Sequence, residues 1–182
     1  ELLNPPAALC GAKRVTTGGA HRAFPAASDV GRLRPEELRA IGLSAQKVRA
    51  LLDLAQAIMH RNLDLEALAR LDDDLVRQRL LGLRGVGRWT AEYVLLRGLG
   101  RLHMFPGDDV GAQKRLAQWL GRRHQPDYSG VGRAVARWQP YAGLIYFHLL
   151  LDGLSQTGAL RPAESDRRLS TTPCWRASAR RP

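Results

Sequence analysis

Residues 80–121, LLGLRGVGRWTAEYVLLRGLGRLHMFPGDDVGAQKRLAQWLG, carry most of the information about the fold of this 182-residue chain. Within residues 75–99, two amphipathic patterns flank the segment Leu83-Arg84-Gly85-Val86-Gly87. Apolar residues that recur at three- and four-residue steps predict helices, and two glycines one residue apart predict a tight connection. This part of the chain is therefore predicted to be two helices joined by a glycine hairpin.

The segments on either side are also predicted to be helical. Pro35 suits the first turn of a short helix that stops near Gly42, and Ser44 suits the cap of a longer one that runs to Met59. Asp64 is expected to open a short helix through Leu71, and the acids at 72–74 to lie at the start of the next. Further helices are expected at residues 110–120, 129–138 and 140–154. No strand of alternating polarity and no internal repeat is evident, so the predicted fold class is all-α.

The chain divides into three predicted regions. Residues 1–19 are rich in turn formers and are left unassigned, as a truncated or divergent N-terminus. Residues 20–154 form the predicted domain. Residues 155–182 are rich in Ser, Thr, Pro, Ala and Arg, and are expected to be a disordered basic tail because they offer little to bury.

Composition favours a polyanionic partner. Lys and Arg total 28 against 17 Asp and Glu, which gives a net charge of +11, and the excess lies in the second half of the chain. A GC-rich genome or a solvated charged helix face would produce the same bias. Charge alone therefore points only weakly to nucleic acid.

The cysteines and the hydropathy pattern exclude other classes. Cys10 and Cys174 lie near opposite ends with no CxxC, so we expect free thiols and no zinc or iron–sulfur site. No stretch approaches the roughly 18 apolar residues of a membrane span, and residue 1 is not followed by a signal-peptide pattern. The chain is expected to be cytoplasmic, near the bacterial nucleoid, with no membrane partner.

The glycine hairpin itself admits two interpretations. Gly85 and Gly87 allow positive φ and a close backbone approach, and the unpaired N–H groups that start the next helix can bind a phosphate oxygen. Together with Arg88 they would form a phosphate clamp that reads no base identity. The alternative is a plain turn between helices, with glycine as the C-cap.

The same residues carry a resemblance to a known family. The hairpin with GRWTAEY, the PGDD segment after LGR, and the later RWQPYAGLIYFHLLL together resemble the helix-hairpin-helix (HhH-GPD) DNA glycosylase superfamily, in its 3-methyladenine DNA glycosylase II branch. A weaker similarity extends back through residues 24–55. The resemblance implies the helix-hairpin-helix glycosylase fold for residues 20–154.

The resemblance also implies a chemistry. Asp109 stands where the family has its catalytic aspartate, which stabilises positive charge on the sugar as the base leaves. Asp108 is expected to cap the following helix. Trp89 and Tyr93 resemble the family's pocket aromatics, on which a flipped, electron-poor base would stack. Ordinary core packing remains the alternative for both rings.

Position 89 and the hairpin carbonyls add two further expectations. Family members that cut the DNA strand have a lysine where this chain has Trp89, so the resemblance implies a monofunctional enzyme. The chain also lacks the four-cysteine cluster of the endonuclease III branch. No cofactor is expected, except a monovalent cation at the main-chain oxygens of Leu81, Leu83 and Val86.

The sequence therefore predicts a monomeric glycosylase that hydrolyses alkylated purines from damaged duplex DNA in base excision repair. Two alternatives stay open. One is a non-catalytic helix-hairpin-helix DNA-binding module or an inactive truncated glycosylase, because residues 1–19 lack the glutamine-rich segment of the family. The other is excision of oxidised purines.

Overall fold

The computed structural model describes residues 13–16, 19–22, 25–60 and 62–158, and these residues are mainly helical. The first half contains α2 (Ala27–Val30), α3 (Pro35–Ala40), α4 (Ala45–Met59), α5 (Leu65–Leu68) and α6 (Asp73–Leu81). The second half contains α7 (Arg88–Tyr93), which continues as the π-helical turn η1 (Val94–Gly98), then α8 (Val110–Trp119), α9 (Tyr128–Val135) with the 3-10 turn η2 (Ala136–Trp138), and α10 (Ala142–Gln156). The predicted all-α fold class is confirmed for these residues.

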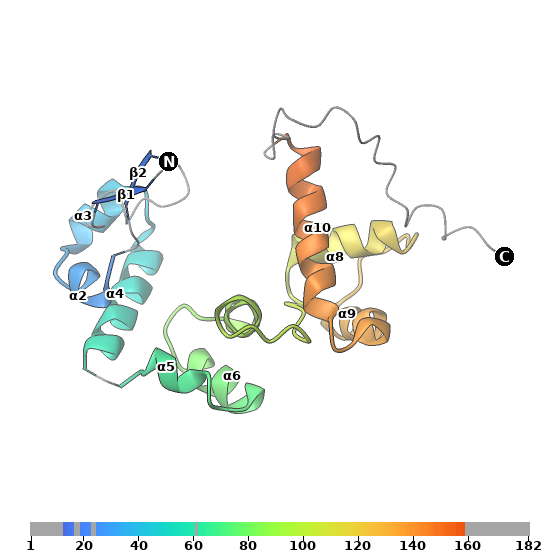
Figure 1. The fold of residues 1–182 in the computed structure, drawn as a ribbon, viewed down its shortest axis with the longest axis horizontal. Coiled ribbons are helices and arrows are strands. Elements are labelled where there is room, and N and C mark those ends of the chain that lie inside the picture. Colours follow the sequence, from blue (N-terminus) through green and yellow to red (C-terminus); the bar gives the residue numbers. More distant parts are fainter. Residues whose placement is uncertain (1–12, 17–18, 23–24, 61, 159–182) are drawn as a thin grey trace.

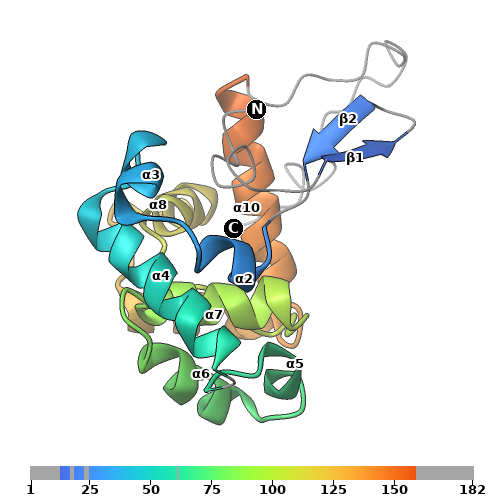
Figure 2. The same ribbon diagram turned by 90° about the vertical axis from the view of Figure 1, so that its left-hand side faces the viewer.

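The helices form two groups on either side of α7. Figure 1 shows α2 to α6 on one side and α8 to α10 on the other, and Figure 2 shows α7 crossing the middle behind α4. Ala91 and Leu95 pack into a core with residues of α5 and α6, whereas Leu96 packs into a second core with α8, α9 and α10. The helix that follows the hairpin therefore joins both cores and fixes the hairpin relative to α8.

Side-chain caps begin three of these helices where the sequence places them. Ser44, Asp64 and Asp72 each accept a hydrogen bond from the backbone N–H three residues later, and Pro35 occupies the first turn of α3. Asp127 does the same for α9 through the N–H of Gly130 at 2.7 Å, a cap that the sequence analysis missed by starting this helix at residue 129. That bond is the main reason why the pKa of Asp127 is lowered.

The hairpin between α6 and α7 requires glycine at one position above all. Gly85 has a φ of 78°, in the left-handed region, and a Cβ there would lie 2.7 Å from the Cβ of Ala50 in α4. Gly87 is the N-cap of α7 with an extended φ of −95°, and a Cβ there would meet nothing within 4 Å. The positive φ that glycine allows is therefore adopted at Gly85 and not at Gly87.

Three details differ from the sequence analysis. A two-stranded antiparallel hairpin, β1 (Lys13–Thr16) with β2 (Gly19–Arg22), pairs Lys13 with Arg22, although no strand was predicted. The last helix begins at Ala142 instead of Pro140, and it ends at Gln156, two residues into the predicted tail. Residues 159–182 of the tail, most of residues 1–19 and both cysteines lie outside the described residues. Among the described residues, none of the helices is long and apolar enough to cross a membrane.

Candidate active site

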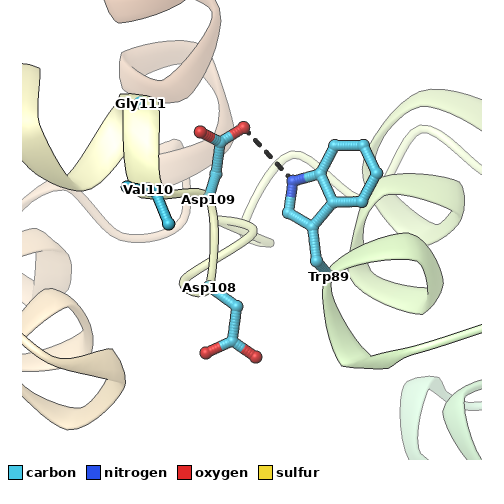
Figure 3. Close-up of a pocket in the computed structure, with 5 residues that line it drawn as sticks. All are labelled: Trp89, Asp108, Asp109, Val110 and Gly111. Atoms are coloured by element: carbon cyan, nitrogen blue, oxygen red, sulfur yellow. Dashed lines mark hydrogen bonds between the residues drawn. The ribbon is translucent and has the colours of Figure 1, made fainter.

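The candidate site centres on Pro106-Gly107-Asp108-Asp109, here called the acid loop, which leads into α8. Asp109 is the N-cap of α8, because its Oδ1 accepts the N–H of Ala112 at 2.8 Å. The prediction that Asp108 caps this helix is therefore wrong. Asp109 sits at the cap position itself, and the adjacent Asp108 points away from the helix (Figure 3).

The second carboxylate oxygen of Asp109 faces other partners. Its Oδ2 accepts the indole N–H of Trp89 at 3.2 Å and the hydroxyl of Tyr146 in α10 at 2.7 Å. Figure 3 shows the Asp109 carboxylate and the Trp89 indole pointing toward each other. Burial of Tyr146 and its hydrogen bond to Asp109 raise the pKa of this phenol, so it remains a donor at neutral pH. Three donors from three elements thus fix the orientation of one carboxylate.

An open pocket of about 300 Å³ lies in front of Asp109, at the lower end of the range for small-molecule sites. It is lined by Trp89, Asp108, Asp109, Val110 and Gly111. Trp89 is 41% exposed, so its ring offers a free edge or face to a ligand. The structure therefore brings together Asp109 and Trp89, two of the residues that the sequence analysis singled out.

Tyr93 lies one turn behind Trp89. The two rings stack at 5.3 Å with an interplanar angle of 21°, and Tyr93 also makes an edge contact with Tyr146 at 6.1 Å. Arg97 donates to the Tyr93 hydroxyl at 3.1 Å. Tyr93 does not line the pocket, so in this structure it supports the ring of Trp89, which is the more exposed of the two.

Arg88 is engaged within the protein. Its guanidinium makes two hydrogen bonds to the Asp108 carboxylate, at 2.6 and 2.9 Å, and lies 3.8 Å from the centroid of the Tyr128 ring. A DNA phosphate would have to share the Arg88 guanidinium with Asp108, which already accepts two of its hydrogen bonds. Within the protein, Arg88 holds Asp108, and its contact with a DNA phosphate stays a prediction.

The hairpin presents unpaired backbone groups. In the described part of the chain, the N–H groups of Gly85 and Gly87 donate to no protein atom, while the N–H of Val86 donates to the carbonyl oxygen of Leu83. The Leu83 oxygen thus retains a second lone pair, and the Leu81 oxygen lies at the C-terminal end of α6, beyond the reach of intrahelical donors. These groups fit both an anion near the glycines and a cation near the carbonyls.

Side chains offer no comparable metal site. Among residues 13–16, 19–22, 25–60 and 62–158, no group of three or more His, Cys, Asp or Glu is arranged to hold a metal ion. His103 pairs with Asp73.

Two polar residues of the site escaped the sequence analysis. Tyr146 is 37 positions from Asp109 and sits in an apolar helix, where a tyrosine usually signals core packing. Glu92 is 0% exposed, although a charged residue in the middle of an amphipathic helix is normally assigned to the solvent. No local pattern distinguishes either residue, because their hydrogen-bond partners lie in α9 and the acid loop.

Comparisons with known proteins show which family and which relatives this chain is similar to. The model of a family described as "HhH-GPD superfamily base excision DNA repair protein" matches residues 7–140. A curated relative, the DNA-3-methyladenine glycosylase of Bacillus subtilis (strain 168), is 27% identical over 126 residues, which cover 69% of this chain and 42% of the relative.

Solved structures of 3-methyladenine DNA glycosylases also superpose on this chain. The 3-methyladenine DNA-glycosylase from Archaeoglobus fulgidus superposes with a TM-score of 0.72 and 26% identity, over 88% of this chain and 53% of that one. A second structure is the Schizosaccharomyces pombe 3-methyladenine DNA glycosylase Mag1 in complex with abasic DNA. It superposes with a TM-score of 0.64 and 27% identity, over 69% of this chain and 62% of the Mag1 chain. The chain therefore spans about half the length of the relatives that it matches.

Proposed function

Because this chain belongs to the HhH-GPD superfamily of base excision DNA repair proteins, we propose that it is a monofunctional DNA glycosylase that removes alkylated purines from duplex DNA. The observation that carries the proposal is that the two carboxylate oxygens of Asp109 have different partners. One oxygen caps α8, and the other accepts hydrogen bonds from Trp89 and Tyr146, while Asp109 and the exposed Trp89 both line the open pocket.

In the proposed reaction, water adds to C1′ of the deoxyribose as the bond to the base nitrogen breaks and the base leaves with the bonding electrons. Positive charge builds up on the sugar, and a fixed carboxylate near C1′ lowers the energy of that transition state. The donors Ala112, Trp89 and Tyr146 hold the Asp109 carboxylate in place before the substrate arrives, so little reorganisation is needed. The proton lost by the water goes to Asp109 or to the solvent.

The proposed leaving group is a base with a formal positive charge, as in 3-methyladenine. Such a base departs readily and needs little protonation, which fits a pocket lined by two carboxylates and an indole, with no histidine or lysine among its lining residues. The ring of Trp89, supported by Tyr93, is the proposed stacking surface for the flipped base.

A hydrolytic route without strand cleavage follows from the identity of the pocket residues. A lyase needs an amine that can attack C1′, and position 89 holds tryptophan. None of the residues lining the pocket is a lysine. The proposed product is therefore an abasic site for another enzyme to process.

Binding of duplex DNA is proposed to involve the glycine hairpin. The unpaired N–H groups of Gly85 and Gly87 suit a phosphate oxygen, and the net charge of +11 suits a polyanion. A monovalent cation held by the carbonyls of Leu81, Leu83 and Val86 would add a positive charge between the hairpin and a phosphate. A monomer acting at the nucleoid is part of the same proposal.

The experiment that tests the proposal is release of bases from methylated duplex DNA. The unaltered chain should release 3-methyladenine, whereas Asp109→Asn should keep the α8 cap through its amide oxygen, bind DNA with similar affinity and lose base release. A parallel duplex with 8-oxoguanine tests for oxidised purines. If the unaltered chain and Asp109→Asn bind DNA equally and neither releases a base, the protein is a non-catalytic DNA-binding module.

A further inference from the structure

Glu92 is a fully buried carboxyl group behind the acid loop. It lies in α7, three residues after Trp89, and 0% of its surface is exposed. Its Oε2 accepts the N–H of Gly107 at 3.0 Å, and its Oε1 accepts the hydroxyl of Tyr128 at 2.6 Å. A buried carboxyl group is tolerated only when such partners satisfy it, so Glu92 depends on both donors.

Gly107 is fixed at both of its hydrogen-bonding groups. While its N–H donates to Glu92, its carbonyl oxygen accepts from Gln113 Nε2 at 2.6 Å. The oxygen of Gln113 in turn accepts from Gln125 Nε2 at 2.5 Å, which orients the amide. A Cβ on Gly107 would lie 2.7 Å from the Tyr128 ring, so this ring packs directly against the loop backbone. The backbone two residues before Asp109 therefore has little freedom.

Arg88 adds a second attachment to the same loop. It holds Asp108 with two hydrogen bonds, and its guanidinium covers the ring of Tyr128 whose hydroxyl binds Glu92. The hydrogen bond that Arg88 donates to Asp108 is the main cause of the raised pKa of Arg88, and the negative charges of Asp108 and Glu92 act in the same direction. Residues 88 and 92 of one helix thus hold residues 107 and 108 of the acid loop.

We infer that Glu92 is a positioning residue for base release: together with Tyr128 it fixes the acid loop at Gly107, and so sets the direction in which Asp109 presents its Oδ2 to the pocket. The inference rests on the proposed function, since it gives Glu92 a part in the same reaction. Glu92 has no exposed surface with which to contact DNA or a base, so it would act only through the loop. A displacement of about 1 Å at a reacting group lowers a rate by about 10²-fold.

The kinetic test compares Glu92→Ala with Glu92→Gln under single-turnover conditions on methylated duplex DNA. Alanine leaves the Gly107 N–H without an acceptor, and we expect the rate constant of base release to fall about 10²-fold while the Kd for DNA stays unchanged. Glutamine can accept from Gly107 with its oxygen and donate to the oxygen of Tyr128 with its amide, so it should restore most of the rate.

The matched control is Leu68→Ala, which removes a side chain with 1% exposure from the core formed with α5 and α6. It should lower the fraction of protein that reacts, which is the amplitude of the single-turnover trace, but not the rate constant. A merely structural role for Glu92 would produce the same pattern. The separation of rate constant from amplitude therefore distinguishes positioning from folding.

A spectroscopic measurement needs no activity. The indole N–H of Trp89 donates to Asp109, so its NMR resonance reports the position of that carboxylate, and Trp89→Phe assigns the signal. Glu92→Ala should shift this resonance, and Glu92→Gln should return it toward the original position. If the unaltered chain releases no base, the proposed function fails while this measurement still tests the positioning.

Three results would overturn the inference. Glu92→Ala could keep the original rate constant, or lose amplitude alone as Leu68→Ala does, or leave the Trp89 indole resonance in place. A slowed rate constant with unchanged Kd, a shifted indole signal and recovery in Glu92→Gln would support it.

Discussion

Substitution of Gly85 by alanine tests the central element of the fold, the hairpin between α6 and α7. Two independent penalties are expected. The left-handed φ of 78° costs a residue with a Cβ about 1–2 kcal/mol, and a Cβ 2.7 Å from that of Ala50 forces repacking worth about 1–3 kcal/mol. Gly85→Ala should therefore lower the free energy of unfolding by about 2–5 kcal/mol.

The two penalties can be separated with a second substitution in α4. Ala50→Gly removes the opposing Cβ, at a cost of about 0.5–1 kcal/mol for glycine within a helix. In that background Gly85→Ala should lose only the conformational part, about 1–2 kcal/mol. Urea denaturation of the four proteins, with a shared m-value, gives the required differences.

Gly87→Ala is the matched control, because this position has an extended backbone and open space around it. Its free energy of unfolding should change by less than about 1 kcal/mol. Its methyl group would obstruct a phosphate, so DNA binding should weaken and the slope of log K against log salt should fall by about 1. A Gly85→Ala protein as stable as the original, or a penalty that Ala50→Gly leaves unchanged, would refute this account of the hairpin.

The other predictions concern the site and the cap of α9. Trp89→Phe keeps a ring on Tyr93 but loses the hydrogen bond to Asp109, so base release should slow about tenfold, as expected for loss of about 1.5 kcal/mol; an unchanged single-turnover rate constant would contradict the role of this bond. The lowered pKa of Asp127 means that its charged form stabilises the folded state above the ordinary value of 3.8, and that this contribution is lost as the pH falls through the lower folded value. The difference in unfolding free energy between the original chain and Asp127→Asn should accordingly shrink on acidification, and a difference independent of pH from 6 to 3 would count against the cap.

Local signals predicted the helices well. Caps such as Ser44 and Asp72 act within three residues of their own position, and the helical period of the apolar residues is a property of one segment. The short β1–β2 hairpin escaped because four-residue strands carry too little alternation to be distinguished from a loop. The identity of the loop Asp that caps α8 depends on where the helix begins, and a difference of one residue moved the cap from Asp108 to Asp109.

The site was predicted only as far as the resemblance reached. Asp109 and Trp89 were named and do come together. Glu92 and Tyr146 were not named, because each depends on a hydrogen-bond partner 15 or more positions away. This partner is Gly107 for Glu92 and Asp109 for Tyr146. Arg88 was assigned to DNA because a free cation beside a glycine hairpin suits a phosphate. Its pairing with Asp108, 20 positions later, is a tertiary contact that no periodicity encodes.

The Asp109 carboxylate caps α8 and is also the proposed catalytic group, and this double role has an evolutionary consequence. Asparagine and serine begin helices about as well as aspartate does, and threonine nearly so. In a lineage that had abandoned repair and kept only the scaffold, this position would drift freely among these four amino acids. In a lineage under selection for excision it would remain aspartate. The amino acid found at this position in closely related natural sequences therefore distinguishes an active enzyme from a protein that has lost base excision, before any protein is purified.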